Sequence, residues 1–191
     1  MNSAMKEFSQ KGFKNASTDV IVNNASISKG ALFYYFKNKK ELFLFLYDYA
    51  INIIKNEILM KFNDDEKDIF ARRLQASMLK IEILNKYPEI YQFTTVAYME
   101  DSAEVKSELE IRNREIIAIG KGFLNEGIDT SKFKEDIDIN SAIDIITWTI
   151  DGFTNKQMEK IKNIPFEKIN LNELLEQMNT YLEMLKKSFY K

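Results

Sequence analysis

The chain has 191 residues, of which 45% are hydrophobic, and its 27 basic and 29 acidic residues give a net charge of −2. It contains neither cysteine nor histidine, which excludes disulfides, thiolate or imidazole metal ligands, and catalysis by either residue. No uncharged apolar run reaches the roughly 18 residues that suggest a membrane-spanning helix, and the first residues lack the apolar core of a signal peptide. We therefore expect a cytoplasmic protein with no membrane partner.

Helical periodicity dominates the N-terminal part of the chain. We expect a first helix over residues 2–11, ended by Gly12 in a left-handed conformation. Ser17 or Thr18 can cap a second short helix, and Ser28 can cap a third. Asn38 can cap a longer fourth helix that runs to about residue 62.

The rest of the chain also has helical spacing and few helix breakers. The 2 prolines and 6 glycines of the whole chain favour long helices. Further helices are predicted over residues 66–86, 88–99, 103–126, 139–161 and 170–188. We expect the last two to be separated near Pro165. The prediction is an all-α chain of about nine helices.

The segment Ser17–Leu42 has the pattern of a helix-turn-helix, with the turn at Ser26–Ile27. Six apolar residues are expected to form its interior: Val20, Ile21, Ala25, Ile27, Leu32 and Phe36. In such a motif the second helix enters the major groove of DNA. Residues 1–47 contain seven lysines and three acids, which gives +4 and leaves −6 for the remainder. A basic head on an acidic body is the asymmetry expected if only the head meets phosphates.

Polar, small and aromatic side chains on this segment are candidates for contacting DNA. Gly30 and Ala31 are small enough for close approach to a groove, Lys29 can donate to guanine or phosphate, and Lys39 lies at a helix N-terminus that favours anions. The candidates are Ser17, Thr18, Ser28, Lys29, Gly30, Ala31, Phe33, Tyr34, Tyr35 and Lys39. The alternative for Ser17 and Ser28 is a capping role only, and Phe33 and Tyr34 are alternatively part of the core.

The order of residues in this region resembles the DNA-binding signature of TetR-family transcriptional regulators. The matching residues are Phe8, Gly12, Phe13, Ser17–Thr18, Ile21, Ala25, Ile27–Ser28, Lys29–Gly30, Leu32–Phe33, Tyr35–Phe36, Lys39 and Leu42. Ser26 replaces the usual turn glycine, and Phe33 replaces a common tyrosine. The resemblance implies a TetR-like fold, with a helix-turn-helix DNA-binding domain over 1–45 and a helical ligand-binding and dimerisation domain over 46–191.

The resemblance also implies roles for the body. The last two helices carry wide apolar stripes, and TetR-like proteins pair these helices in a homodimer. The expected interface residues are Ile146, Ile150, Phe153, Leu175, Met178 and Leu182. A pocket in the body is expected to take an apolar or aromatic small molecule, with Tyr98, Met99, Phe123 and Trp148 as its lining residues. We expect no cofactor and no metal.

These observations predict a ligand-responsive transcriptional regulator. It is expected to bind a palindromic double-stranded operator as a homodimer, to act as a repressor, and to be released by a small molecule. The alternative is a DNA-binding dimer whose body is a protein-interaction platform with no small-molecule inducer. An enzyme is not expected, because no nucleophile–base arrangement is visible in the sequence.

Overall fold

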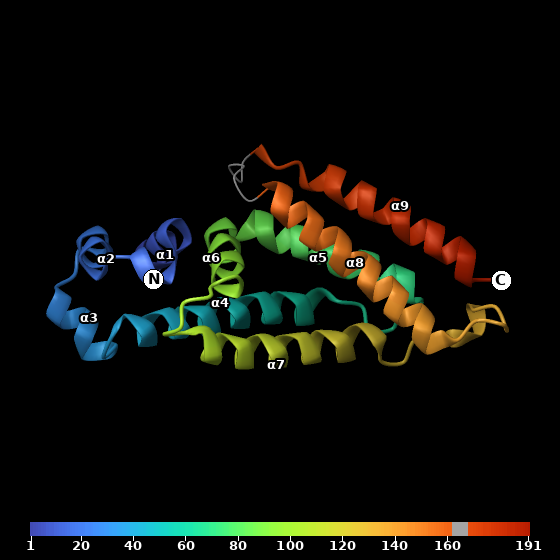
Figure 1. The fold of residues 1–191 in the computed structure, drawn as a ribbon, viewed down its shortest axis with the longest axis horizontal. Coiled ribbons are helices and arrows are strands. Elements are labelled where there is room, and N and C mark those ends of the chain that lie inside the picture. Colours follow the sequence, from blue (N-terminus) through green and yellow to red (C-terminus); the bar gives the residue numbers. More distant parts are fainter. Residues whose placement is uncertain (162–167) are drawn as a thin grey trace. The chain divides into compact units, whose positions relative to one another are not determined.

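A computed structural model describes residues 1–161 and 168–191, which form nine α-helices and one short 3-10 helix (Figure 1). The α-helices are α1 (Asn2–Asn15), α2 (Thr18–Ala25), α3 (Lys29–Tyr35), α4 (Lys39–Lys61), α5 (Ile69–Lys86), α6 (Pro88–Tyr98), α7 (Lys106–Asn125), α8 (Ile139–Ile161) and α9 (Leu171–Phe189), and the 3-10 helix is η1 (Thr130–Lys132). The predicted all-α class is confirmed. Among the described helices, none is long and apolar enough to span a bilayer.

Most helix boundaries lie close to the predicted ones, and the differences have local causes. Helix α5 begins at Ile69, because the Asp68 carboxylate accepts hydrogen bonds from the N–H groups of Phe70 and Ala71 and so fixes the start. In α1 the helix is interrupted at Gly12, whose φ of 67° is in the left-handed region, and a further helical turn follows it. The break predicted near Pro165 lies outside the described residues.

The chain forms two compact units. The first consists of Met1–Phe62 and Glu82–Phe123, and the second consists of Asn63–Ile81 and Leu124–Lys191. Helices α1 to α4 and α6 therefore belong to the first unit, α8 and α9 belong to the second, and α5 and α7 contribute to both. The functional division into residues 1–45 and 46–191 follows a different boundary and stays a prediction.

An aromatic cluster forms the centre of the first unit. Phe43 of α4 has its ring centroid 4.9 Å from that of Phe8, 5.3 Å from that of Phe13 and 5.4 Å from that of Phe93. All four rings are completely buried. Because these residues come from α1, α4 and α6, the cluster joins the first helix of the head to α4 and α6.

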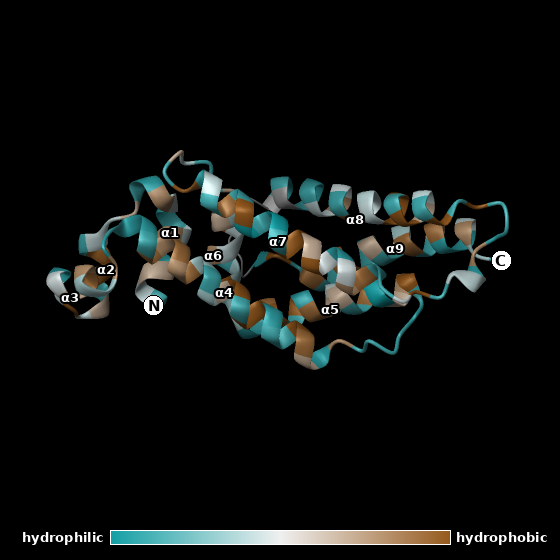
Figure 2. Cartoon of the chain, turned by 90° about the horizontal axis from the view of Figure 1, so that it is seen from below, coloured by the Kyte–Doolittle hydropathy of each residue, from teal (hydrophilic) through white to brown (hydrophobic). Residues whose placement is uncertain are grey.

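The second unit has its own hydrophobic core, to which α8 and α9 contribute. These two helices lie side by side in both ribbon views (Figures 1 and 2), and each shows apolar and polar residues on different sides. The buried residues of this core are Ile69, Phe70, Phe133, Ala142, Ile146, Met178 and Leu182. The backbones of Phe133 and Tyr190 form an isolated antiparallel bridge at the end of the unit.

The interior of the helix-turn-helix differs from the prediction at two positions. Ile21 and Leu32 are buried as expected, but Val20 and Ile27 are exposed. In a helix of two turns the buried side is set by a few residues, and Ile21 and Val22 occupy it in α2, so that Val20 lies on the outer side. The prediction for Val20 and Ile27 was therefore wrong.

Candidate nucleic-acid interface and effector region

Local side-chain caps hold the two short helices α2 and α3. The Ser17 hydroxyl accepts a hydrogen bond from the Val20 N–H at 3.4 Å, and the Ser28 hydroxyl accepts one from the Ala31 N–H at 3.0 Å. Between the helices, Ser26 has φ 54° and ψ 40°, a left-handed conformation that glycine adopts more easily and that the usual turn glycine would supply. The capping roles considered for Ser17 and Ser28 are thus present in the structure.

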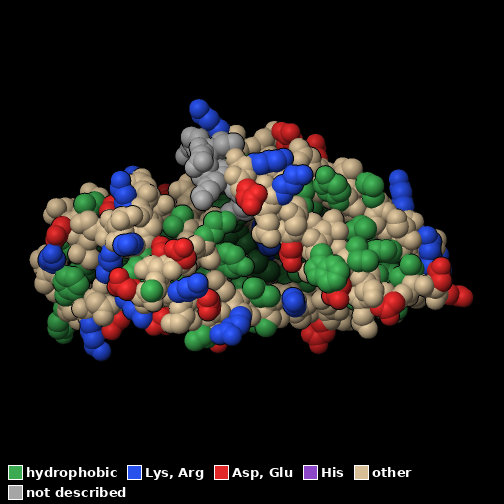
Figure 3. Space-filling model, in the orientation of Figure 1, with side chains coloured by type: hydrophobic (Ala, Val, Ile, Leu, Met, Phe, Trp, Pro, Cys, Tyr) green, Lys and Arg blue, Asp and Glu red, His purple; other side chains and the backbone are tan. Residues whose placement is uncertain are grey.

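Helix α3 presents small and aromatic side chains to solvent. Gly30, Ala31, Tyr34 and Tyr35 are exposed, and Phe33 is at the edge of exposure. The Tyr34 and Tyr35 rings meet edge to face at 5.2 Å. A Cβ placed on Gly30 would lie 3.9 Å from the Ser28 hydroxyl, an ordinary contact, so packing within the chain does not require glycine there. Figure 3 shows apolar side chains over this end of the first unit.

The two lysines predicted to bind DNA already have partners. The Lys29 ammonium lies 2.7 Å from the Asp19 carboxylate, and both side chains are exposed, so this pair can be exchanged for a phosphate contact at low cost. The Lys39 ammonium donates to the carbonyls of Lys14 at 3.0 Å and Ala16 at 3.2 Å, and lies 4.8 Å from the centre of the Phe13 ring. Lys39 therefore ties the start of α4 to the end of α1, a role that sequence reasoning missed.

The remaining candidates lie at helix starts. Ser17 and Thr18 at the start of α2 are half-buried, and Ser28 before α3 is exposed. Lys37, in the turn that follows α3, was not predicted, although its side chain is 87% exposed. Its position two residues before the α4 start could have indicated it, since helix starts attract anions.

Buried and half-buried carboxylates fasten the head within the first unit. The Glu7 carboxylate accepts a hydrogen bond from the Ser17 N–H at 3.0 Å, at the point where α1 gives way to α2. The Glu100 carboxylate accepts from the Phe13 N–H at 2.7 Å, next to the interruption at Gly12, and from the Ser102 N–H at 3.0 Å. The residues that precede α7 are thereby hydrogen-bonded to the backbone of α1.

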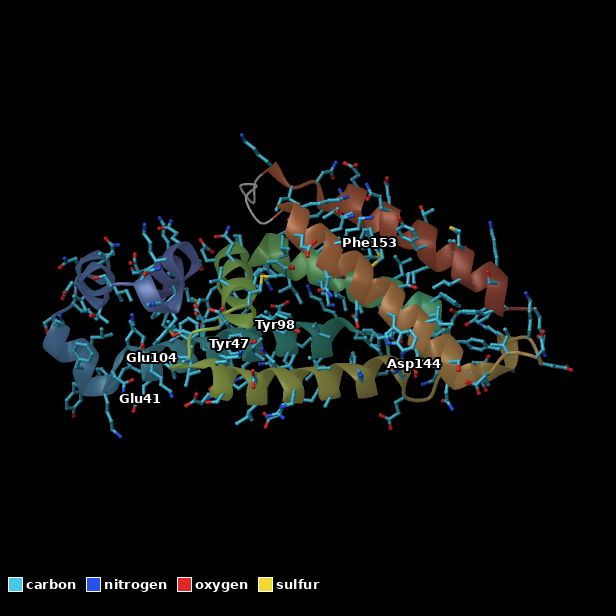
Figure 4. All side chains as sticks on the ribbon, viewed as in Figure 1. Glu41, Tyr47, Tyr98, Glu104, Asp144 and Phe153 are labelled. Carbon is cyan, nitrogen blue, oxygen red and sulfur yellow. The ribbon has the colours of Figure 1, made fainter. Side chains whose placement is uncertain are left out.

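Polar contacts also connect α4 with α7 in the first unit. The Tyr47 hydroxyl donates to the Asn113 side-chain oxygen at 2.5 Å (Figure 4), and the Arg112 guanidinium pairs with both oxygens of Asp48 at 2.7 and 2.9 Å. Burial, and then the nearby Tyr98 and Asp48, raise the pKa of Tyr47 to about 12, against the opposing charge of Arg112. The hydroxyl therefore stays protonated and keeps its donor role.

The four residues predicted to line a pocket have different surroundings. Tyr98 and Met99, at the end of α6, are both more than half exposed. Phe123 in the last turn of α7 is half-buried, and its ring centroid lies 4.3 Å from that of Phe62. Trp148 on α8 is 67% exposed, so α8 places it at the surface of the second unit. Three of these side chains, those of Tyr98, Met99 and Trp148, are therefore largely open to solvent in their own units.

The second unit contains buried cations that sequence reasoning did not find. The Arg73 guanidinium on α5 donates to the side-chain oxygens of Asn125 at 2.5 Å and Thr147 at 3.3 Å, and Arg73 is only 6% exposed. The neighbouring Arg72 donates to the Glu126 carbonyl at 2.5 Å. These partners lie more than fifty residues away in sequence, so no local pattern indicates them.

The residues predicted to form a dimer interface on α8 and α9 differ in their burial within the single chain. Ile146, Met178 and Leu182 are buried by their own chain, because they form the contact between these two helices. Ile150, Phe153 and Leu175 are half-buried beside them, and the Phe153 ring lies 5.8 Å from that of Tyr181 (Figure 4). Four other apolar side chains are exposed instead: Ile145, Trp148, Tyr181 and Met184. Figure 3 shows apolar side chains gathered over α8 and α9.

No group of three or more carboxylates in the described ranges is placed to hold a metal ion. The chemical groups gathered in the head are exposed donors, small residues and aromatic rings on a short helix, which suit a groove and its phosphates. Those gathered in the second unit are desolvated cations and amides, which suit an anion.

Comparisons with known proteins identify relatives of the helix-turn-helix segment and of the whole chain. Residues 1–46 match the family model of bacterial regulatory proteins of the tetR family. The fatty acid metabolism regulator protein of Bacillus subtilis (strain 168) is 25% identical over 158 residues, which cover 79% of this chain and 77% of that protein.

Two solved structures share the fold over nearly their whole length. The fatty acid degradation regulator FadR from Bacillus halodurans superimposes with a TM-score of 0.69 and 17% identity, covering 95% of this chain and 94% of that one. FadR from Bacillus subtilis, solved in complex with stearoyl-CoA, gives a TM-score of 0.66 and 18% identity, covering 96% and 94%. At these identities the likeness to the two structures shows the fold alone.

Proposed function

Because the chain belongs to the TetR family of transcriptional regulators and carries its helix-turn-helix, we propose that it is a homodimeric repressor of a palindromic operator, released by a small molecule. The family and its relatives are regulators rather than enzymes. The observation that carries the proposal is the exposed face of α3, where small and aromatic residues lie between capped helix starts. One head reads few base pairs, so two heads on two half-sites give the affinity.

The proposed ligand carries a long acyl chain, and a fatty acyl-CoA is the first candidate. Support comes from the relative named as a fatty acid metabolism regulator and from the structural neighbour solved with stearoyl-CoA. This proposal narrows the expected apolar or aromatic ligand to an amphipathic one. It also agrees with the buried cations of the second unit, which an entirely apolar ligand would leave unused.

Helix α4 is the proposed route from ligand to head. Helix α4 begins at Lys39, four residues after α3 ends at Tyr35. The Tyr47–Asn113 and Asp48–Arg112 contacts attach it to α7. A shift of α7 would therefore move the start of α4 and, with it, α3. Half-sites lie about 34–36 Å apart along DNA, so small displacements prevent both heads from binding together. Tenfold derepression needs about 1.4 kcal/mol of differential ligand affinity.

Selection from a random duplex library at low salt tests the DNA-binding proposal. We expect a palindromic consensus, and a log affinity that falls linearly with log salt by roughly 0.9 per neutralised phosphate. Lys29→Ala should change sequence preference, and Lys37→Ala should weaken all sequences and flatten the salt dependence. Lys55→Ala, an exposed lysine on α4, is the matched control. If no sequence is enriched, the proposal is wrong.

Release by ligand needs a separate measurement. A thermal-shift screen of fatty acids and their CoA esters should identify stabilising compounds, and each should then be tested for dissociation of the selected operator. Compounds that stabilise the protein and release DNA support the repressor proposal. Operator binding that responds to none of these compounds would favour a body that binds proteins instead.

A further inference from the structure

Arg73 is a buried cation without a buried counterion. Its guanidinium is held by two neutral groups, the amide of Asn125 and the hydroxyl of Thr147. Its Nε is buried and has no hydrogen-bond partner, and no carboxylate of the described chain pairs with it within 4.0 Å. A desolvated charge of this kind is strongly unfavourable unless an anion or further hydrogen bonds compensate it. The Arg73 guanidinium therefore keeps an uncompensated charge and an unused Nε–H donor, both of which an anion from outside the chain would satisfy.

A second cation lies on the same side of α5. Lys80 follows Arg73 by seven residues, which is two helical turns. Lys80 is exposed as a residue, but partial desolvation of its ammonium lowers its pKa; Asp151 of α8 opposes this effect, and the positive charge of Arg73 adds to it. Burial also lowers the pKa of Arg73, again against Asp151. The one negative charge of Asp151 thus acts on two cations, the buried Arg73 and the exposed Lys80, and it cannot neutralise both.

The neighbouring Arg72 does not change this balance. Its guanidinium has its own contacts, with the Asp64 carboxylate at 3.5 Å and the Glu126 carbonyl. The positive charge of Arg72 also lowers the pKa of Arg73, so it adds to the positive potential rather than reducing it. The cluster of Arg73 and Lys80 with Asp151 keeps an excess of one positive charge.

Apolar groups adjoin the cationic cluster. Ser77 lies between Arg73 and Lys80 on α5, and its hydroxyl is 3.7 Å from the sulfur of Met178 on α9. On α8, half-buried Ile143 and Ile150 flank Thr147 along the helix and pack on the core of the second unit. An anion bound at Arg73 would therefore have hydrocarbon beside it, which is the pattern that suits an amphipathic molecule.

We propose that Arg73, assisted by Lys80, binds the anionic head of an acyl-chain ligand. This inference rests on the ligand class proposed above and adds the residues that recognise its charge. A guanidinium with a free Nε–H can donate to a carboxylate or phosphate oxygen with favourable geometry. Carboxylate and phosphate share this chemistry, so the head is either that of a free fatty acid or the phosphates of a CoA ester.

Calorimetric titration of the full chain with four probes tests the inference. The probes are dodecanoate, dodecanoyl-CoA, free coenzyme A, and dodecanol, which has the same chain length without a charge. For the wild type we expect at least one acyl anion to bind about tenfold or more tightly than dodecanol, as a charge-assisted hydrogen bond implies. Preference for dodecanoate indicates a carboxylate head, and preference for dodecanoyl-CoA together with binding of coenzyme A indicates phosphates.

Three variants separate recognition of charge from folding. Arg73→Gln should remove the preference for the anion and leave the affinity for dodecanol unchanged. Lys80→Met should reduce the preference by a smaller factor. Lys156→Met removes an exposed lysine of α8 in the same unit and should change nothing. Circular dichroism checks that each variant is folded. If Arg73→Gln does not fold, the exposed Lys80 position decides the question.

Several outcomes would overturn the inference. If the wild type binds dodecanol as tightly as both acyl anions, or binds no probe at all, the result contradicts the inference. An anion preference that persists in Arg73→Gln contradicts it as well. If Arg73→Gln does not fold, an anion preference that is unchanged in Lys80→Met has the same meaning. Operator binding by the same wild-type sample is measured in parallel. If it persists, the failure concerns the ligand head alone, and the DNA-binding part of the proposed function stands.

Discussion

The helix-turn-helix head and the second unit place their polar groups in opposite ways. In the head, Ser17 and Ser28 cap helices over three residues, and the charged and aromatic side chains of α3 face solvent. In the second unit, Arg73 is buried and its partners come from α7 and α8. A surface of exposed groups on a rigid aromatic core suits a large external partner, whereas buried charges suit a small enclosed one.

The largest expected effect comes from the core under the head. Phe43→Ala removes a ring that contacts three other buried rings, and such truncations cost about 3–5 kcal/mol. We expect urea denaturation to show this loss, with operator binding lost in parallel. Phe45→Ala is the control, because Phe45 is about half exposed, and its effect should be much smaller. Equal effects would mean that the head does not depend on this cluster.

The exposed apolar side chains of α8 and α9 give the next prediction. Trp148→Glu combined with Met184→Glu should convert a dimer to a folded monomer, because an unpaired charge buried in an interface costs several kcal/mol. Light scattering gives the mass, and circular dichroism confirms folding. Asn172→Glu, at an exposed polar position of α9, should leave the dimer intact. A wild type that is monomeric on dilution would contradict the proposed dimer.

Asp68 predicts a dependence of stability on pH in the second unit. Burial alone would raise the pKa of its carboxyl, but hydrogen bonds from Lys132 and the Ala71 N–H, with the charge of Lys186, lower it on balance. Because the folded chain then binds this proton less readily than the unfolded chain, the stabilisation is present above about pH 4 and is lost as the pH falls through the folded-state pKa.

Two Asp68 variants separate charge from capping. Asp68→Asn keeps the acceptor for the N–H groups of Phe70 and Ala71, so it should reduce the acid-side slope while preserving the cap. Asp68→Ala should cost about 0.5–2 kcal/mol in addition, through loss of the cap. Thermal melts between pH 3 and 7 provide the measurement. An unchanged slope in Asp68→Asn would contradict the assignment.

The smallest predicted effect concerns the contact between α4 and α7. Tyr47→Phe removes the hydrogen bond to Asn113 and should cost about 1 kcal/mol. Since the folded-state pKa of Tyr47 is raised to about 12, its contribution to stability is present below about pH 10 and is lost as the pH rises towards 12. Because the pKa values of Tyr91 and Tyr190 are raised as well, ultraviolet titration should show one fewer late-ionising tyrosine in Tyr47→Phe than in the wild type. Tyr34→Phe, an exposed position, is the control.

Local interactions explain which parts of the fold could be predicted from the sequence. The caps at Ser17, Ser28 and Asn38 were predictable because donor and acceptor are three residues apart. Ser26 stands where the TetR-family pattern has a turn glycine, and its conformation is left-handed. Helix boundaries followed from periodicity, and the departures, such as the start of α5 at Ile69, arose where another cap was available.

Interactions between distant residues could not be predicted. Nothing near Lys39 shows that the carbonyls of Lys14 and Ala16 will bind its ammonium. The stripes of α8 and α9 were visible, but a stripe does not say whether it meets the same chain or a second one, and Leu182 packs within its own chain at 2% exposure. The sequence around Arg73 is typical of a surface position, because the residues that surround its guanidinium come from α7 and α8.

At Gly30, the stability of helix α3 and its close approach to DNA favour different residues. Its surroundings leave room for a methyl group, and alanine at a helical position that tolerates it commonly adds about 0.4–1 kcal/mol. The chain therefore gives up stability at the helix that we propose enters the groove. Selection for tolerance of heat would favour alanine there, and selection for close approach to a partner would favour glycine. A laboratory evolution experiment that rewards only thermal resistance should recover Gly30→Ala, and its carriers should bind the operator less tightly.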